Sequence, residues 1–226
     1  MAKSKKEIIS IKSVSKIYNL GETVVKALDN VSLSIYDNDY ISIMGPSGSG
    51  KSTLLSIIGT LDNADSGELL INGMSIDDNT NIDKLRNKSI GFVFQFHNLI
   101  SELTLEENVS LPKMIAKEQL GKKELIELFE YFDLKDRMNS FPNDLSGGEK
   151  QRVAVMRAII NNPSIVIADE PTGNLDKENA FKMMSLFQKL NTEKKLTIIV
   201  ATHDEDVFNI GHKKYQLVDG TLELVH

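Results

Sequence analysis

The chain has 226 residues and a formal net charge of −6, and its acidic and basic residues are interleaved. Its hydrophobic share of 41% can build a packed core, which excludes disorder as the state of the whole chain. The acidic balance argues against a nucleic-acid-binding surface, and we expect no nucleic-acid partner. The chain has no cysteine, which excludes disulfides and cysteine-ligated metal sites and fits a reducing cytoplasm.

No segment of the sequence predicts passage through a membrane. Residues 1–10 carry lysines without an apolar run behind them, so we expect no secretory signal. No window approaches the roughly 20 apolar residues that a membrane-spanning helix needs. If the protein works at a membrane, we therefore expect another molecule to anchor it there.

The first third of the chain is predicted to consist mainly of strands. The strand pattern occurs in five segments: residues 7–18, 24–36, 40–44, 67–73 and 89–95. The first two are rich in β-branched residues and flank a turn at 19–22, and the segment 67–73 ends in an Asn-Gly turn. The segments 40–44 and 89–95 are short and apolar, as expected for strands buried on both faces. A helix is expected at 51–61.

The middle of the chain is mostly helical in pattern. A first helix over 105–119 starts after Thr104, an N-cap that has Glu107 three residues further on. Two further helices are expected over 122–134 and 147–162, and the first of these carries an apolar stripe.

The last third returns to alternating strands and helices. Strands are expected at 164–170 and 196–204, and residues 215–225 are typical of a hairpin around Asp-Gly. The helix between the strands has an apolar face that consists of Ala180, Met183, Met184, Phe187 and Leu190. This alternation predicts a mostly parallel sheet with right-handed crossovers.

Strand-rich flanks around a helical insert indicate one domain rather than two. We expect residues 1–226 to form a single α/β domain. Its core is expected at about 1–95 and 162–226, and the helical part at about 96–161.

A loop of small residues between a strand and a helix fits the phosphate-binding pattern, in which Lys and Ser or Thr follow the second of two glycines. The loop comprises Gly45, Pro46, Ser47, Gly48, Ser49, Gly50, Lys51 and Ser52. Small residues let backbone N–H groups surround an anion, and the helix start adds its positive dipole end. Lys51 can reach the β- and γ-phosphates, and the Ser52 hydroxyl can bind Mg²⁺. The alternative, a flexible linker with an incidental lysine, does not fit a position between an apolar strand and an amphipathic helix.

Two acids end the strand at 164–170, where the second half of a nucleotide site is expected. Asp169 can hold Mg²⁺, directly or through water, and Glu170 can polarise a water for attack on the γ-phosphate. The alternative is that both acids only cap the turn-rich segment that follows. A phosphate loop earlier in the same chain favours the nucleotide site.

The segment 145–152 adds a second helix start that can bind an anion. Leu145, Ser146, Gly147 and Gly148 offer a hydroxyl and two bare backbone amides. In isolation these residues would indicate an ordinary serine N-cap with a flexible glycine pair. One nucleotide needs only one such helix start, so a second start requires an explanation.

Along the chain the phosphate loop is followed by Gln95 after Phe-Val-Phe, Leu-Ser-Gly-Gly at 145–148, the two acids that end the strand 164–170, Asn-Leu-Asp at 174–176 and His203. These motifs, in this order, resemble those of the nucleotide-binding subunit of ABC transporters, and the similarity covers essentially the whole chain. The resemblance implies a P-loop NTPase core with a mostly parallel sheet, an N-terminal antiparallel β subdomain and an inserted helical subdomain. It implies an ATPase that uses ATP and Mg²⁺ and converts ATP and water to ADP and phosphate. It also implies a homodimer in the ATP-bound state, in which each ATP lies between one phosphate loop and the partner's Leu-Ser-Gly-Gly.

The same resemblance implies roles for individual residues. Tyr18 resembles the aromatic residue that stacks on adenine, for which strand packing is the alternative. The ATP-binding set is completed by Thr53 and by Gln95, which is expected to bind Mg²⁺ together with Ser52 and Asp169. Catalysis is expected to depend on Glu170, His203 and Lys51. The surface that completes the partner's site is expected to contain Leu145, Ser146, Gly147, Gly148, Glu149 and Asp176.

Several segments together are similar to those of the ATPases of macrolide exporters and lipoprotein-release systems. They are residues 45–55, 92–95, 98–100, 103–109, 111–112 and 168–176. This implies a peripheral subunit at the cytoplasmic face of the plasma or inner membrane that powers an integral permease of the four-helix type. The alternatives are an ATPase that transmits force without transport, as in cell division or peptide sensing, and a soluble ATPase that acts on ribosomes or DNA. The chain departs from the family at Glu149, where Gln is usual, and at Phe96 and His97.

Overall fold

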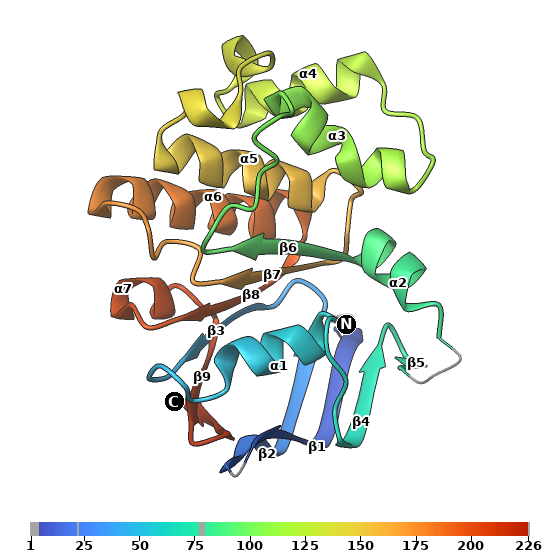
Figure 1. Cartoon of the computed structure of the whole chain (residues 1–226), viewed down its shortest axis with the longest axis vertical. Helices are drawn as coiled ribbons and strands as arrows, with labels where there is room; N and C mark the ends of the chain where they lie inside the picture. Colours follow the sequence, from blue (N-terminus) through green and yellow to red (C-terminus); the bar gives the residue numbers. More distant parts are fainter. Residues whose placement is uncertain (1–4, 22, 77–79, 226) are drawn as a thin grey trace.

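Two β-sheets organise the protein, and helices cover and separate them (Figure 1). The computed structural model describes residues 5–21, 23–76 and 80–225. Figure 1 shows α1 between the two sheets and α3 to α6 on the opposite face of the larger sheet. The α/β fold class predicted from the sequence is confirmed.

The smaller sheet is antiparallel and has the strand order β2-β1-β4-β5. Its strands are β1 (Glu7–Leu20), β2 (Thr23–Tyr36), β4 (Ser66–Ile71) and β5 (Met74–Ser75). The Asn-Gly turn between β4 and β5 is confirmed, because Asn72 and Gly73 have the positive φ values of 52° and 78° that a two-residue hairpin requires. Glu22, part of the turn predicted at 19–22, lies outside the described residues.

The larger sheet has the strand order β10-β9-β3-β8-β7-β6. Its strands are β3 (Tyr40–Met44), β6 (Ile90–Phe94), β7 (Ile165–Asp169), β8 (Thr197–Thr202), β9 (Lys213–Val218) and β10 (Thr221–Val225). All of its neighbours pair in parallel except the β9–β10 hairpin. The carboxyl ends of β3, β6, β7 and β8 therefore lie at one edge of the sheet, where ligands of such folds usually bind.

The sequence missed two helices and placed the ends of four others three or four residues too late. The helices are α1 (Lys51–Ile58), α2 (Ile82–Ser89), α3 (Leu105–Ile115), α4 (Lys122–Tyr131), α5 (Gly147–Ile159), α6 (Lys177–Lys194) and α7 (Glu205–Phe208). The helices predicted over 122–134 and 147–162 end at Tyr131 and Ile159. The predicted helix 51–61 ends at Ile58, and the predicted helix 105–119 ends at Ile115. Left-handed backbone at Thr60 and Lys117, with φ of 58° and 56°, turns the chain out of each helix.

Helices α2 and α7 have little apolar pattern for a sequence reading to detect. Leu85 is the buried residue of α2, and α7 is one turn long. Their starts are set by caps, because the Asn81 side chain accepts a hydrogen bond from Lys84 N and Asp204 accepts from Asp206 N and Val207 N.

The core of the protein consists of two apolar clusters, one on each face of the larger sheet. Alternate residues of β8 belong to different clusters: Ile198 and Val200 pack with α3 to α6, whereas Ile199 and Ala201 pack with α1 and the smaller sheet. The segments 40–44 and 89–95, predicted as strands buried on both faces, also contribute to both clusters: Tyr40 and Val93 to the first, Ile41 and Ile90 to the second. Burial on both faces fixes the strand ends that carry the site.

A buried carboxylate joins the segment before β1 to the amino ends of β3 and β9. Asp39, which is 3% exposed, accepts hydrogen bonds from Lys5 Nζ at 2.8 Å, Lys213 Nζ at 2.7 Å and Tyr36 N at 3.0 Å. Burial by itself raises the pKa of Asp39, but these hydrogen bonds outweigh it and leave the pKa below its ordinary value. The ionised carboxylate therefore stabilises the folded state.

We expect Asp39→Asn to lower the free energy of unfolding by about 2 kcal/mol at pH 7, because two lysines lose their shared counter-charge. A lowered pKa in the folded state means that this contribution is present above the ordinary pKa of 3.8 and is lost as pH falls through the folded value. The difference between the wild type and the variant in urea unfolding should therefore shrink below about pH 4.

The control for this experiment is Glu68→Gln, because Glu68 forms an ion pair with Lys12 in which both side chains are exposed. That variant should change the free energy of unfolding by less than about 0.5 kcal/mol. A difference between wild type and Asp39→Asn that stays constant from pH 7 to pH 3 would contradict the assignment.

Candidate functional site

The loop between β3 and α1 has the backbone geometry of an anion-binding site. Gly50 caps α1 with φ of 105° and offers no side chain to the first N–H groups of the helix. A Cβ at Gly50 would collide with the carbonyl oxygen of Ala27, and a Cβ at Gly45 with that of Leu217. Both positions therefore require glycine, and the amides at the start of α1 remain available to a ligand.

Lys51 folds back over this loop. Its Nζ donates hydrogen bonds to the carbonyl oxygens of Gly45 at 2.7 Å and Pro46 at 3.2 Å. It lies 4.0 Å from Glu170 Oε1, and the side chain is 8% exposed. The ammonium group is thus held above the loop by carbonyl groups that an incoming phosphate can replace.

Asp169 ends β7 with one carboxylate oxygen in an unusual position. Among the described residues, its Oδ1 is buried and has no hydrogen-bond partner. Burial raises the pKa of Asp169, and the neighbouring Glu170 adds to the effect, whereas a hydrogen bond with Ser52 and the charge of Lys51 oppose it.

These groups fit Mg²⁺, which takes oxygen ligands and usually keeps only one or two carboxylates from the protein. Ser52 and Asp169 would hold the ion, and Gln95 lines the same cleft. Within the described residues no three His, Asp or Glu side chains form a metal cage. Such a cage is not needed, because substrate phosphates and water complete the shell.

Glu170 has a strained backbone that directs its side chain into the site. Its φ of 47° is rare outside glycine, and its amide donates to Ala201 O at 2.9 Å. The side-chain Oε2 lies 2.9 Å from Nδ1 of His203 and accepts a hydrogen bond from His203 N at 3.3 Å. The acid that ends β7 is therefore fixed against the loop that follows β8.

Gln95 connects the end of β6 to the segment that follows Glu170. The Gln95 side chain donates to Asn174 Oδ1 at 3.5 Å, and Asn174 Nδ2 donates back to Gln95 O at 3.1 Å. A Cβ at Gly173 would lie 2.8 Å from Gln95 Nε2, so glycine permits this approach. Sequence reasoning assigned a role to Asp176, two residues further on, but none to Asn174.

The predicted nucleotide residues meet in one cleft of about 740 Å³. It is lined by Tyr18, Val25, Ala27, Ser47, Gly48, Gly50, Lys51, Ser52, Thr53, Gln95, Asp169, Glu170 and His203. Sequence reasoning missed Val25 and Ala27, although Val25 pairs with Tyr18 across β1 and β2 and such pairing was the available signal. Gly45, Pro46 and Ser49 belong to the loop but do not line the cleft.

The predicted partner-site residues do not line this cleft. Ser146 caps α5, and Glu149 accepts hydrogen bonds from Ser146 N at 2.9 Å and Ser146 Oγ at 2.7 Å. Asp176 caps α6 by accepting from Asn179 N at 2.8 Å. The packing of Gly148 against Asn179 and of Gly147 against Leu175 connects these two helix starts within the chain.

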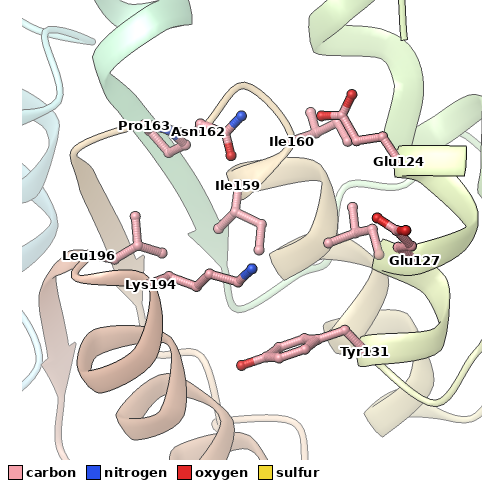
Figure 2. A pocket seen from close by; sticks show the side chains of 10 residues that line it. Glu124, Glu127, Tyr131, Ile159, Ile160, Asn162, Pro163, Lys194 and Leu196 are labelled. Atoms are coloured by element: carbon pink, nitrogen blue, oxygen red, sulfur yellow. The ribbon is translucent and has the colours of Figure 1, made fainter. Parts of the chain in front are cut away.

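A second cavity, of about 420 Å³, lies between α4 and the ends of α5 and α6 (Figure 2). Tyr131 and Lys194 point into it, and Lys194 Nζ lies 5.5 Å from the centre of the Tyr131 ring. None of the predicted site residues lines it. It has no phosphate loop, so it is no rival for nucleotide binding.

Residues 28–173 match the protein family described as ABC transporter. The chain belongs to this family. It is an ATP-binding cassette ATPase, for which ATP is the substrate and Mg²⁺ the metal ion. None of the helices in the described ranges has the length and hydropathy of a membrane span.

Characterised and uncharacterised cassettes resemble this ATPase over nearly its whole length. It is 45% identical to the uncharacterized ABC transporter ATP-binding protein MJ0796 of Methanocaldococcus jannaschii, over 96% of this chain and 95% of that protein. It is 40% identical to the lipoprotein-releasing system ATP-binding protein LolD of Wigglesworthia glossinidia brevipalpis, over 95% of this chain and 96% of that protein. It is also 40% identical to the macrolide export ATP-binding/permease protein MacB of Syntrophobacter fumaroxidans, over 96% of this chain and 31% of that longer protein.

Two solved structures of MJ0796 confirm the cassette fold. A dimeric structure has a TM-score of 0.86 and 44% identity, over 96% of this chain and 97% of that chain. A dimeric post-hydrolysis structure with bound ADP and Pi has a TM-score of 0.87 and 42% identity, over 97% and 99%.

We expect Ser52→Ala to weaken binding of ATP in the presence of Mg²⁺ about 10-fold and to change binding in EDTA by less than about 2-fold. The physical reason is the loss of an oxygen ligand beside Asp169, while the backbone amides that contact phosphate remain. Titration calorimetry under both conditions measures the effect. Ser56→Ala, one turn further along α1, is the control, and an equal loss with and without Mg²⁺ would contradict the assignment.

Proposed function

We propose that two copies of this ATPase close head to tail around two molecules of MgATP and thereby drive a membrane permease. The observation that carries the proposal is the separation of two anion-binding helix starts within one chain. The start of α1 lines the nucleotide cleft, whereas the start of α5, with Ser146 and two glycines, does not. A second copy supplies the nucleotide that the start of α5 needs.

In this proposal each residue of the cleft has a different role in ATP hydrolysis. Lys51 and the loop amides neutralise charge on the β- and γ-phosphates. Ser52 and Asp169 would hold Mg²⁺, which would supply further charge neutralisation. Glu170 accepts a proton as the water oxygen attacks the γ-phosphorus and the bond to the bridging oxygen breaks, releasing ADP and phosphate. His203 orients Glu170 through the 2.9 Å contact.

The helical part at about 96–161 is proposed to move as a unit when the nucleotide state changes. Gln95 is the residue before this part, and its hydrogen bonds with Asn174 connect it to the segment after Glu170. A change at the γ-phosphate can therefore reach the helical part through one side chain.

An apolar groove beside Gln95 fits the permease. It has a volume of about 560 Å³, and its apolar lining includes Leu61, Phe92, Phe94, Leu111 and Ile115. Polar and charged side chains also line it: Asp83, Arg86, Asn87, Arg157 and Asn161. Phe94 directly precedes Gln95, so the groove is continuous with the coupling segment. Ile115, which lines the groove, is 73% exposed, and the preceding Met114 is 65% exposed; this apolar area favours a partner of matching chemistry, a cytoplasmic helix of the permease.

The likeness to LolD and MacB supports a permease of the four-helix type and a position at the cytoplasmic face of the plasma or inner membrane. MacB combines an ATP-binding and a permease part in one protein, and this chain matches 31% of its length. Force transmission without transport, as in cell division or peptide sensing, is the alternative within the same arrangement.

We expect Glu170→Gln to bind MgATP, to accumulate as a dimer and to lose turnover by about 10²–10⁴-fold, because the amide cannot accept the water's proton. Light scattering with MgATP and a phosphate-release assay measure the two effects. Glu178→Gln, which removes an exposed ion pair with Lys182 on α6, is the control. Full turnover in Glu170→Gln would refute the assignment of Glu170 as the general base. If the variant stays monomeric at saturating MgATP, the proposed ATP-bound dimer is refuted.

We expect Ile115→Asp to abolish co-purification with the native permease from detergent-solubilised membranes while ATP-dependent dimerisation is unchanged. A carboxylate at the rim must be desolvated when an apolar helix covers the groove. Leu224→Asp on β10, where the leucine is 48% exposed, is the matched control. Retention of the permease by Ile115→Asp would place the interface elsewhere.

A further inference from the structure

We propose that Asp62 is a positioning residue for nucleotide binding, because it holds the ring of Tyr18 in the orientation that receives adenine. This inference rests on the proposed role of Tyr18. The end of the cleft that would receive the adenine base is, in this inference, shaped by a small network of side chains outside the phosphate loop.

The phenol group of Tyr18 is not free. Its Oη donates a hydrogen bond to Asp62 Oδ2 at 2.7 Å, and the Thr53 hydroxyl also bonds to it. Tyr18 lines the nucleotide cleft together with Val25 and Ala27, which add an apolar wall. A ring with one end bonded and one side in the cleft has little rotational freedom left to lose when a base stacks on it.

Asp62 is itself fixed by a buried cation. Lys16, which is 9% exposed, donates to Asp62 Oδ1 at 2.9 Å and to Asn63 O at 2.6 Å, and lies 3.6 Å from Asp65 Oδ1. Its Nζ is 5.3 Å from the centre of the Tyr18 ring. The hydrogen bond from Tyr18 lowers the pKa of Asp62, and Lys16 lowers it further against the effect of burial. The network therefore contains an ionised acceptor, which makes strong hydrogen bonds.

The backbone after α1 determines where Asp62 lies. Left-handed backbone at Thr60 reverses the chain, and the amides of Leu61 and Asp62 both donate to Ser56 O, at 2.8 Å and 3.3 Å. Asp62 is thereby brought alongside α1, the helix whose first turn meets the phosphates. The network thus connects the adenine end of the cleft, at Tyr18, to helix α1, which begins at the phosphate loop.

Tyr18→Phe and Asp62→Ala test the inference in the 226-residue chain. Each should weaken MgATP binding about 10-fold, because a hydrogen bond to a charged group is lost. Neither should change the binding of Mg²⁺-tripolyphosphate, which lacks the base, by more than about 2-fold. In steady-state kinetics KM should rise about 10-fold with little change in kcat. The double variant should be no weaker than either single variant, because both remove the same contact.

Three further variants make the outcome decisive. Tyr18→Ala removes the ring and tests the proposed role of Tyr18 alone. Asp62→Asn keeps an acceptor and should lose less ATP affinity than Asp62→Ala. Glu68→Gln removes an exposed β1–β4 ion pair with Lys12 and should have no effect.

If Asp62→Ala lost equal affinity for ATP and for tripolyphosphate, the inference would be overturned, because Asp62 would then support the structure of the whole site rather than the orientation of Tyr18. Wild-type ATP affinity in Asp62→Ala and Tyr18→Phe, with a loss in Tyr18→Ala, would overturn it while leaving the role of the ring intact. Wild-type preference for ATP over tripolyphosphate in Tyr18→Ala would instead refute the role of Tyr18 itself.

Discussion

The parallel register of the larger sheet determines where the chemistry of this ATPase lies. Phe94 is opposite Asp169, Asp169 is opposite Ala201, and Met44 is opposite Thr202. The loops that follow these residues begin at the same edge and carry Gly45, Gln95, Glu170 and His203. A shift of one residue in any strand would reverse its side chains and move its loop. The register is maintained because residues on both faces of β7 and β8 are buried in separate apolar clusters.

This rigid edge also supports backbone conformations that would otherwise be unfavourable. Glu170 has a φ of 47°, at a cost of order 1–3 kcal/mol for a residue with a side chain. Its amide bonds to Ala201 O at 2.9 Å, and its carboxylate contacts His203 at 2.9 Å, so strand β8 and the loop that follows it fix the conformation. The strain and the contacts have one result: the acid that follows Asp169 faces the phosphate loop rather than solvent.

The sequence predicted those parts of the site that follow from short local patterns. The glycines before Lys51 and the two acids at the end of an apolar strand are recognised from neighbouring residues alone, and residues of both groups line one cleft. The contact of Tyr18 with Asp62 joins residues 44 positions apart, and it depends on a left-handed residue, Thr60, that no pattern predicts. Helix α2 was missed for a related reason, because with Leu85 as its buried residue it has no apolar stripe.

Glu149 shows how a departure from the family pattern can be accommodated within one chain. In the proposed dimer this carboxylate would lie near the partner's triphosphate, where its negative charge by itself opposes closure. Here the carboxylate accepts two hydrogen bonds from Ser146 at the start of α5, and Arg137 Nε lies 3.9 Å from its Oε1. The Ser146 hydrogen bonds lower the pKa of Glu149, and the charge lies at the positive end of the helix dipole. The side chain that caps α5 thus has its charge balanced by its own helix and by Arg137, and glutamate can replace glutamine because both form the same capping box.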